Sequence, residues 1–366
     1  MAKMVNICDV CSEIFAGGDA PKNNMSIVQT DEYNIPIYSN GEVNDGLYGF
    51  TNFARVSEPS ITVSARGTIG YTSIRNTPFV PIVRLITLVP KKDVIDIRYL
   101  FYAAQNYHFD GSGTSIPQLT VPALKKYNFP LPTIAEQKQI VIVLDKICHL
   151  ITLRKKQLSK LDELVKSRFV ELFANKDYEK VTVSSVLNTG FWLMPATPEF
   201  IVDGEVPYIT SKNIKNRTID FDNVKYISKE AYKSISANRP TQKGDILVSM
   251  IGTLGQTAVI QDDREFYGQN LYLLRLNNSV VDTTYFCEFF NSDTAQHELQ
   301  GKRNQSTQAY LKANHVENLV LPLAPLTIQK QFAAFVEQTD ESKLAIQQSL
   351  EKLETLKKAL MQQYFE

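Results

Sequence analysis

A gapless internal repeat constrains this chain more than any other feature of its sequence. Residues 130–173 and 322–365 align at a constant offset of 192, from 130 to 322, without an insertion. A repeat of this length predicts two copies of one structural plan. The identical pairs, with the first copy before the second, include Pro130 and Pro322, Gln137 and Gln329, Leu161 and Leu353, and Phe173 and Phe365.

Each copy has the pattern of one long helix. Thr133 and Glu136 have the spacing of a capping box at the start of the first copy, and Pro325 near the start of the second suits a first helical turn. Neither copy contains Gly, nor Pro beyond its start. From Glu136 to Phe173 such a helix is about 57 Å long. The expected a and d positions of a heptad are Leu144, Ile147, Ile151, Arg154, Leu158, Leu161, Val165, Arg168 and Leu172 in the first copy, and Val336, Thr339, Lys343, Ile346, Leu350, Leu353, Lys357, Leu360 and Tyr364 in the second.

These heptads indicate that the two helices pair with each other, and the symmetry of the repeat favours an antiparallel coiled coil. A parallel, in-register pairing would instead stack Ile151 on Lys343 and Val165 on Lys357. A register in which residue numbers sum to 504 brings a positions against d positions, for example Ile151 against Leu353. The same register brings Lys155 within reach of Glu354 and leaves Asp162 without a cation. The alternative is an ordinary amphipathic helix on a globular core, which repetition and length both disfavour. The predicted arrangement relates the two halves of the chain by a pseudo-twofold axis.

Composition indicates a folded protein of two or three domains. The chain has 366 residues, is 43% hydrophobic and 10% aromatic, and contains no apolar run long enough to span a membrane. Its four cysteines are scattered, which favours a reducing, cytoplasmic location. Cys8 and Cys11 have the CxxC spacing, but without a second such motif we interpret them as incidental buried thiols. A net charge of zero argues against a broad basic surface, although not against a local basic cleft.

The segments before each helix repeat a second, strand-rich plan. Short apolar runs alternate with Gly, Pro, Asn and Asp turns, and Ile97–Asn106 is predicted to be a short helix. The predicted division is 1–128 for a first globular domain, 129–175 for a first long-helix segment, 176–320 for a second globular domain and 321–366 for a second long-helix segment. The matches between the two domains are Val5–Ile7 with Val181–Val183, Ile35–Ile37 with Val206–Tyr208, Val63–Gly70 with Val248–Gly255, Tyr99–Tyr102 with Tyr285–Glu288, and Thr114–Leu119 with Ser306–Leu311.

With these residues the whole chain resembles the specificity subunit of type I restriction-modification enzymes. The most specific signal is Phe129–Pro132 leading into Glu136–Ile140, and the second copy keeps Leu321–Leu323 and Gln329–Gln331. The second copy departs from the family in having Ile328 where Glu is usual. The resemblance implies an α+β fold of two target-recognition domains, each followed by a long helix.

The resemblance also implies a DNA reader without chemistry of its own. Each recognition domain would read one half of a bipartite sequence in double-stranded DNA. Two modification subunits carrying S-adenosylmethionine would methylate adenine, and two restriction subunits would add ATP- and Mg-dependent cleavage. No cofactor, metal or membrane is expected for this chain itself. The residues agree, because we find no phosphate-binding loop, no dinucleotide loop and no adenine-methyltransferase tetrad.

Polar side chains that read base edges or phosphates cluster in the turn-rich segments of each domain. Ser64 and Ser249 occur in both domains, so we interpret them as parts of the shared frame. The predicted DNA-binding residues are Ser39, Asn40, Arg66, Thr68, Thr114, Ser115 and Gln118 in the first domain, and Ser211, Lys212, Asn213, Gln269, Asn270, Lys302, Arg303, Asn304, Gln305, Ser306 and Thr307 in the second.

Two other functions stay open at the level of sequence. An enzyme that modifies DNA alone would need the cofactor motifs that we do not find, and a purified chain that methylates DNA unaided would support it. A structural adaptor would use the helices to hold other proteins, and loss of binding to every DNA sequence, even with the methyltransferase present, would favour it.

Overall fold

The computed structural model describes residues 2–107, 118–174, 176–215, 217–252, 254–302 and 310–366. It divides into two compact units. Unit 1 consists of Met1–Lys156 with Gln347–Glu366, and unit 2 of Gln157–Ile346. The boundaries between the units, after Lys156 and after Ile346, lie within the two long helices, so each helix contributes residues to both units. The domain and long-helix boundaries drawn from the sequence lie instead at the ends of the helical segments.

Unit 1 is built from short strands and helices that precede the first long helix. A four-stranded antiparallel sheet has the order β2-β8-β5-β6, and a three-stranded sheet has the order β4-β3-β7 with β3 and β7 parallel. Strand β1 pairs with β9. The elements are β1 (Lys3–Asn6), α1 (Ile7–Val10), β2 (Cys11–Ala16), β3 (Ile35–Tyr38), η1 (Val43–Gly46), β4 (Leu47–Thr51), β5 (Ser60–Val63), β6 (Thr72–Arg75), β7 (Val80–Pro81), β8 (Ile86–Pro90), α2 (Ile97–Asn106), α3 (Val121–Leu124), β9 (Asn128–Leu131), and parts of α4 (Ile134–Phe169) and α9 (Leu326–Phe365).

Unit 2 repeats this topology. Its sheets have the orders β11-β19-β16-β17 and β15-β12-β18, its strand β10 pairs with β20, and a β13-β14 hairpin is additional. The elements are η2 (Val170–Ala174), β10 (Glu179–Thr182), η3 (Val183–Val186), β11 (Leu187–Leu193), β12 (Val206–Ile209), η4 (Ser211–Asn213), β13 (Ile214–Lys215), β14 (Thr218–Ile219), β15 (Lys225–Ile227), α5 (Lys229–Ser236), β16 (Ile246–Ser249), β17 (Thr257–Val259), β18 (Tyr267–Gly268), β19 (Leu271–Leu276), α6 (Thr283–Phe290), α7 (Asp293–Gly301), α8 (Ala313–Glu317) and β20 (Val320–Leu323).

A buried glutamine ties the start of each long helix to its strand-rich domain. In unit 1 Gln137, fully buried, accepts from the backbone N–H of Asp96 at 2.8 Å and donates to the carbonyl of Pro132 at 2.9 Å. In unit 2 Gln329 accepts from the backbone N–H of Asp282 at 2.8 Å and donates to a carbonyl in the same way. Because Asp96 and Asp282 cap α2 and α6, the glutamine that identifies the sequence repeat is a structural link.

Each strand-rich domain packs against the end of the helix that belongs to the other copy of the repeat. Tyr99 of α2 lies 5.0 Å, between ring centroids, from Phe365 at the end of α9. Tyr285 of α6 lies 4.5 Å from Phe173, just beyond α4. Tyr99 corresponds to Tyr285 in the repeat, and Phe365 corresponds to Phe173, so the same contact is made twice with the helices exchanged.

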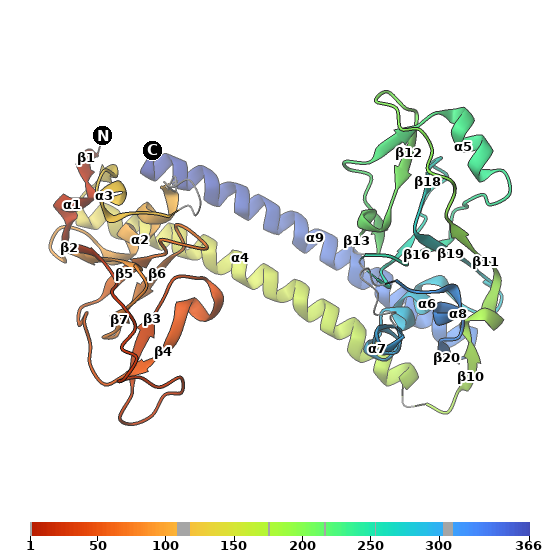
Figure 1. The fold of residues 1–366 in the computed structure, drawn as a ribbon, viewed down its shortest axis with the longest axis horizontal. Helices are drawn as coiled ribbons and strands as arrows, with labels where there is room; N and C mark the ends of the chain where they lie inside the picture. Colours follow the sequence, from red (N-terminus) through yellow and green to blue (C-terminus); the bar gives the residue numbers. More distant parts are fainter. Residues whose placement is uncertain (1, 108–117, 175, 216, 253, 303–309) are drawn as a thin grey trace. The chain divides into compact units, whose positions relative to one another are not determined.

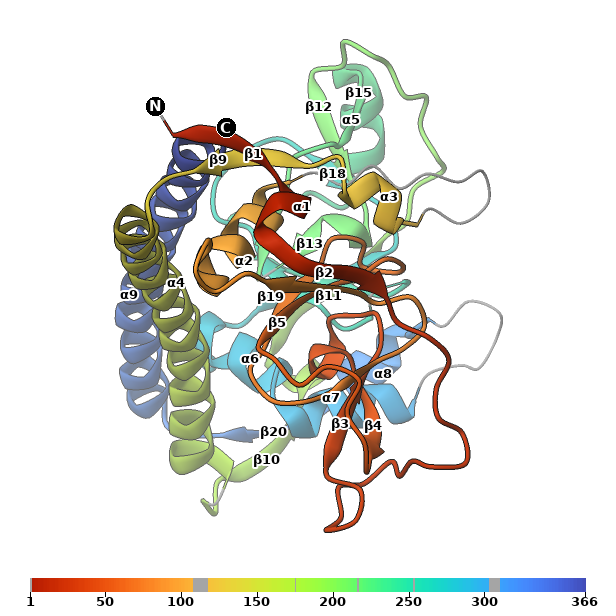
Figure 2. The same cartoon turned by 90° about the vertical axis from the view of Figure 1, so that its left-hand side faces the viewer.

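Within each unit the two helices lie side by side and run in opposite directions (Figures 1 and 2). In unit 1 the core joins Leu144 of α4 to Met361 of α9, and in unit 2 it joins Val165 to Phe332. The expected a and d positions are all buried or half-buried. The antiparallel pairing predicted from the heptads is therefore confirmed.

Charged contacts between the helices agree with the predicted register in one place and correct it in another. Lys155 lies 3.0 Å from Glu354, as expected. Asp162, predicted to have no cation, lies 2.8 Å from Lys343. That prediction was wrong because Lys343, which the register places against Leu161, extends its long side chain to the neighbouring carboxylate. The prediction that Cys8 and Cys11 are both buried was also half wrong, since Cys11 is buried and Cys8 is exposed.

Candidate nucleic-acid interface

Asn40 brings three loops of the first domain together. Its Oδ1 accepts from the backbone N–H of Ala65 at 2.7 Å, and its Nδ2 donates to the carbonyl of Val83 at 2.6 Å. The backbone N–H of Gly41 donates to Ser64 Oγ at 3.2 Å. Asn40, which is half-buried, therefore holds these loops together through its amide, and its predicted contact with DNA stays a prediction.

The same loops form a group of two arginines around one glutamine. Arg66 donates to Gln118 Oε1 through Nε at 3.0 Å and through Nη2 at 2.8 Å. Arg84 donates to the same oxygen through Nη1 at 3.4 Å. Arg66 is half-buried and Arg84 is exposed. Two of these three residues were predicted from the sequence, whereas Arg84 was missed because no local pattern distinguishes it.

Arg84 stands on a strained turn between β7 and β8. Val83 and Arg84 have φ of 53° and 64°, in the left-handed region that side chains with a Cβ disfavour. Each such residue costs on the order of 1–3 kcal/mol. Hydrogen bonds from the two backbone N–H groups to the carbonyls of Gly18 and Gly17, at 2.7 and 3.0 Å, hold the turn. A Cβ on Gly17 would lie 2.6 Å from the carbonyl carbon of Pro81, so this close approach requires glycine.

A third arginine of this domain is already neutralised. Arg75 is 4% exposed and pairs with Asp45. Its guanidinium also lies 3.6 Å from the centroid of the Tyr38 ring. These contacts hold the η1 turn, in which Asp45 has a positive φ of 55°. Arg75 therefore stabilises the fold, whereas the guanidinium groups of Arg66 and Arg84 meet a neutral acceptor.

The serine shared by both domains belongs to the frame, as interpreted from the sequence. Ser64 and Ser249 are 1% and 0% exposed. In both loops the serine carbonyl accepts from a glycine N–H, that of Gly70 at 2.9 Å and that of Gly255 at 2.8 Å. Both glycines have positive φ, which suits tight turns.

The second domain assembles its loops in a related way. The side chain of Asn213 accepts a hydrogen bond from the backbone N–H of Thr210 at 3.0 Å and donates one to the carbonyl of Asp220 at 2.9 Å. Like that of Asn40, its amide forms hydrogen bonds within the fold. The backbone N–H of Gln269 donates to the carbonyl of Ile209 at 3.2 Å, and the carbonyl of Asn270 accepts from Met250 at 3.2 Å. Two predicted segments, around residues 211–213 and 269–270, therefore lie in one connected loop cluster, which also includes Met250 after β16.

The remaining predicted residues have varied positions. Ser39 is half-buried at the end of β3, Ser211 is buried, and Thr68 and Lys212 are exposed. Lys302 pairs with Glu298 at 2.6 Å within the last turn of α7 and its C-cap. The predicted residues that lie outside the described part of the chain are Thr114, Ser115, Arg303, Asn304, Gln305, Ser306 and Thr307.

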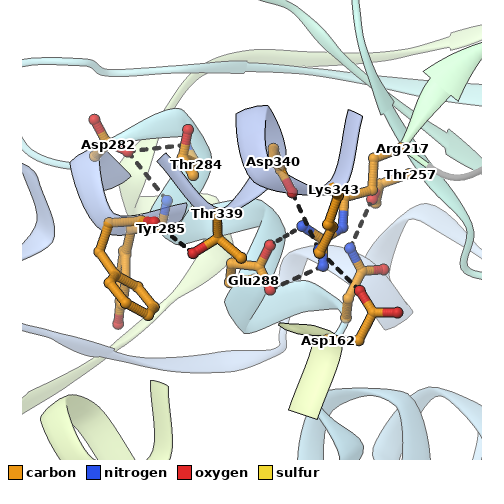
Figure 3. A network of polar contacts seen from close by, with 12 residues as sticks. Asp162, Arg217, Thr257, Asp282, Thr284, Tyr285, Glu288, Thr339, Asp340 and Lys343 are labelled. Carbon is orange, nitrogen blue, oxygen red and sulfur yellow. Dashed lines mark hydrogen bonds and ion pairs between the residues drawn. The ribbon is translucent and has the colours of Figure 1, made fainter. Parts of the chain in front are cut away.

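An ionic network with the buried carboxylate of Glu288 in it joins the β13–β14 hairpin region, α6 and α9 in unit 2 (Figure 3). Arg217, between β13 and β14, pairs with Glu288 of α6, whose side chain is 5% exposed. Burial raises the pKa of Glu288, and the nearby Arg217 opposes that shift. Lys343 of α9 lies 2.8 Å from Asp162 and 3.1 Å from Asp340. Although burial opposes the charged form of Lys343, hydrogen bonds to these two carboxylates raise its pKa.

The described residues contain no group of three or more His, Cys, Asp or Glu side chains arranged to hold a metal ion. No helix in the described ranges is both long enough and apolar enough to cross a membrane.

Comparison with known proteins matches two stretches of the chain, 2–163 and 175–357, to the type I restriction modification DNA specificity domain. A putative type I specificity subunit of Mycoplasma pneumoniae is 35% identical over 167 residues, covering 43% of this chain and 49% of the relative. The specificity subunit of the MjaIX enzyme of Methanocaldococcus jannaschii is 22% identical over 329 residues, covering 82% and 76%. The chain spans about half the length of the Mycoplasma pneumoniae relatives with which it aligns at 34–35% identity.

Solved structures match over nearly the whole length. The S subunit of a type I restriction-modification system from M. genitalium has a TM-score of 0.61 at 14% identity, covering 100% of this chain and 96% of that one. A structure described as showing complex assembly of the type I R-M system has a TM-score of 0.59 at 14% identity, covering 99% and 97%. At these identities the match concerns the fold.

Proposed function

The chain belongs to the type I restriction modification DNA specificity family, and we propose that it is the subunit that reads a bipartite DNA sequence for a type I restriction-modification complex. The observation that carries this proposal is the duplication of one frame with different loops. Each unit has the same sheet orders and the same glutamine link, while the polar side chains in its loop cluster differ. Two readers of different half-sites need this combination.

The proposed reading uses polar groups on the loops and not the bulk charge of the chain. Phosphate contacts position a protein on the duplex, and contacts to base edges specify the sequence. The net charge of zero leaves few cations for phosphate neutralisation. We therefore expect the isolated chain to bind DNA weakly, and tight binding to require partner subunits that enclose the duplex. Specific binding by the isolated chain at nanomolar concentration and physiological salt would contradict this expectation.

An exposed apolar face on α4 supports docking of partner subunits. In unit 1 the side chains of Ile142, Val143, Leu150 and Leu153 are 38–44% exposed. Successive residues of a helix are about 100° apart, so these four fall within an arc of about 100°. Apolar side chains grouped on one face of an exposed helix are typical of an interaction surface.

In the proposed complex this chain contributes recognition and assembly, and it is not an enzyme. Two modification subunits would hold S-adenosylmethionine and methylate adenine, and two restriction subunits would use ATP and Mg. Within this chain the tasks are to position loops on the two half-sites and to set their separation through the helix pair. The two recognition units would then act independently.

The test is to map N6-methyladenine in the DNA of cells that carry this chain and its methyltransferase partner. We expect a bipartite motif that is absent when this chain is omitted. Methylation by the purified chain alone would show instead an autonomous enzyme. Failure to bind any DNA sequence in the presence of the methyltransferase would show a structural adaptor. Either result would overturn the proposal.

A further inference from the structure

We propose that Arg84 reads a guanine in the major groove of the half-site bound by the first domain. Gln118 is held by Arg66 and positions the guanidinium group of Arg84. The inference rests on the proposed function and assigns one base contact within it. Arg66, Arg84 and Gln118 are far apart in the sequence, and both arginines donate hydrogen bonds to one oxygen atom, Oε1 of Gln118.

The first argument is the balance of charge and hydrogen bonds. Gln118 Oε1 accepts from both guanidinium groups and carries no charge. Within the described residues neither Arg66 nor Arg84 forms an ion pair, in contrast to Arg75, Arg98 and Arg275. A guanidinium has five N–H donors, and Arg84 uses one of them on Gln118. Its Nε and the far Nη are left to donate to a ligand with two electronegative atoms.

The second argument is orientation. Arg66 grips Gln118 through two donors on one edge, so the position of Oε1 is fixed. That oxygen in turn accepts from one Nη of Arg84 at 3.4 Å, a long hydrogen bond that orients the guanidinium. A guanine presents O6 and N7 as a pair of acceptors in the major groove, and an arginine donates to both only when its plane is aligned with the base. A phosphate accepts from many directions and needs no such alignment. The strained backbone of Val83 and Arg84 is a further sign that the position of this side chain is specified.

The third argument is that only the first domain has the group formed by Arg66, Arg84 and Gln118, whereas both domains have the backbone hydrogen bond beside it. The backbone N–H of Leu119 donates to Ala65 at 2.8 Å, and that of Leu311 donates to Met250 at 2.9 Å. Next to this shared hydrogen bond the second domain has Ile251 and Tyr310, which form a β-bridge. At the corresponding positions the first domain has Arg66 and Gln118.

The connection that carries Arg84 is also longer in the first domain. In the first domain, residues 82–85 connect β7, which ends at Pro81, to β8, which begins at Ile86. In the second domain, only residues 269–270 connect β18, which ends at Gly268, to β19, which begins at Leu271. The two additional residues of the first domain are Val83 and Arg84, the pair with positive φ. A reading element should vary in this way, whereas a structural element of the frame should not.

The experiment maps N6-methyladenine in cells that carry the methyltransferase partner and either the unchanged chain or a variant. We expect a G·C pair in the first half-site. Arg84→Ala should lower discrimination at that one position by about 10- to 100-fold and leave the second half-site intact. Gln118→Ala should relax the same position. Arg84→Lys keeps the charge but lacks the planar fork, so it should retain only part of the discrimination. Lys92→Ala removes an exposed cation paired with Glu58 and serves as the matched control, with the motif unchanged.

Each alternative outcome is distinct. If Arg84→Ala lowers methylation without relaxing any position, Arg84 contacts a phosphate and the inference fails. It also fails if the first half-site contains no G·C pair. Retention of the other positions of the first half-site shows that the first domain of each variant is folded. The absence of any bipartite motif with the unchanged chain would instead contradict the proposed function.

Discussion

Removal of Arg217 isolates the contribution of the buried network in unit 2. Arg217→Ala leaves the carboxylate of Glu288, which is 5% exposed, without its nearest cation. Loss of one partner of a buried pair costs about 3–5 kcal/mol. The Arg217 side chain is 37% exposed and Lys343 remains nearby, so we expect the lower cost of about 2–3 kcal/mol at neutral pH.

The cost should depend on pH in a defined direction. Burial raises the pKa of Glu288, and Arg217 opposes the shift, so the variant carboxyl has a still higher pKa. A group whose pKa is raised by folding stabilises the folded state when protonated and loses that contribution as the pH rises through the folded pKa. The penalty of Arg217→Ala should therefore be larger near about pH 8 than near about pH 5.

The assay uses urea unfolding followed by the fluorescence of Trp192, the single tryptophan of the chain, which lies on β11 in unit 2. Adding Glu288→Gln to Arg217→Ala should recover most of the stability, because no buried charge remains. Lys215→Ala removes an exposed cation from the same hairpin and should cost less than about 1 kcal/mol. An equal penalty at both pH values, or no recovery in the double variant, would refute the reasoning.

Three further predictions concern the repeat and the helices. Gln329→Ala leaves buried backbone groups without hydrogen-bond partners and should lower the free energy of unfolding reported by tryptophan fluorescence by about 2–4 kcal/mol. Gln137→Ala, in the other unit, should leave that transition unchanged. Equal effects of the two substitutions would show that the two glutamines do not stabilise their units separately. With the four native cysteines replaced, Ile151→Cys with Leu353→Cys should crosslink readily, and Ile151→Cys with Lys343→Cys should not; the reverse would indicate parallel helices. Exchange of the first recognition domain for that of a related subunit should change one half of the methylated motif, and a change in both halves would exclude independent readers.

The site residues show the limit of prediction from local pattern. Arg66 and Gln118 were predicted because both are polar residues in turn-rich segments. Their pairing and the addition of Arg84 depend on three loops that only the folded chain brings together. Asn40 and Asn213 carry the same chemistry as a DNA contact, yet their side chains are engaged by the backbone. Residue type alone does not distinguish the two roles, because the same amide serves either one.

The sequence by itself determined the repeat and the two long helices, because heptad spacing and repetition are properties of order along the chain. It favoured their antiparallel pairing mainly through the symmetry that a repeat implies. It also determined Ile97–Asn106 as a helix, which the structure has with the same bounds. Only the tertiary structure decided that Phe173 and Phe365 each pack into the domain of the other copy, and that Lys343 reaches Asp162. Such contacts join residues that are distant in sequence, so they depend on backbone geometry and side-chain reach, which no local periodicity encodes.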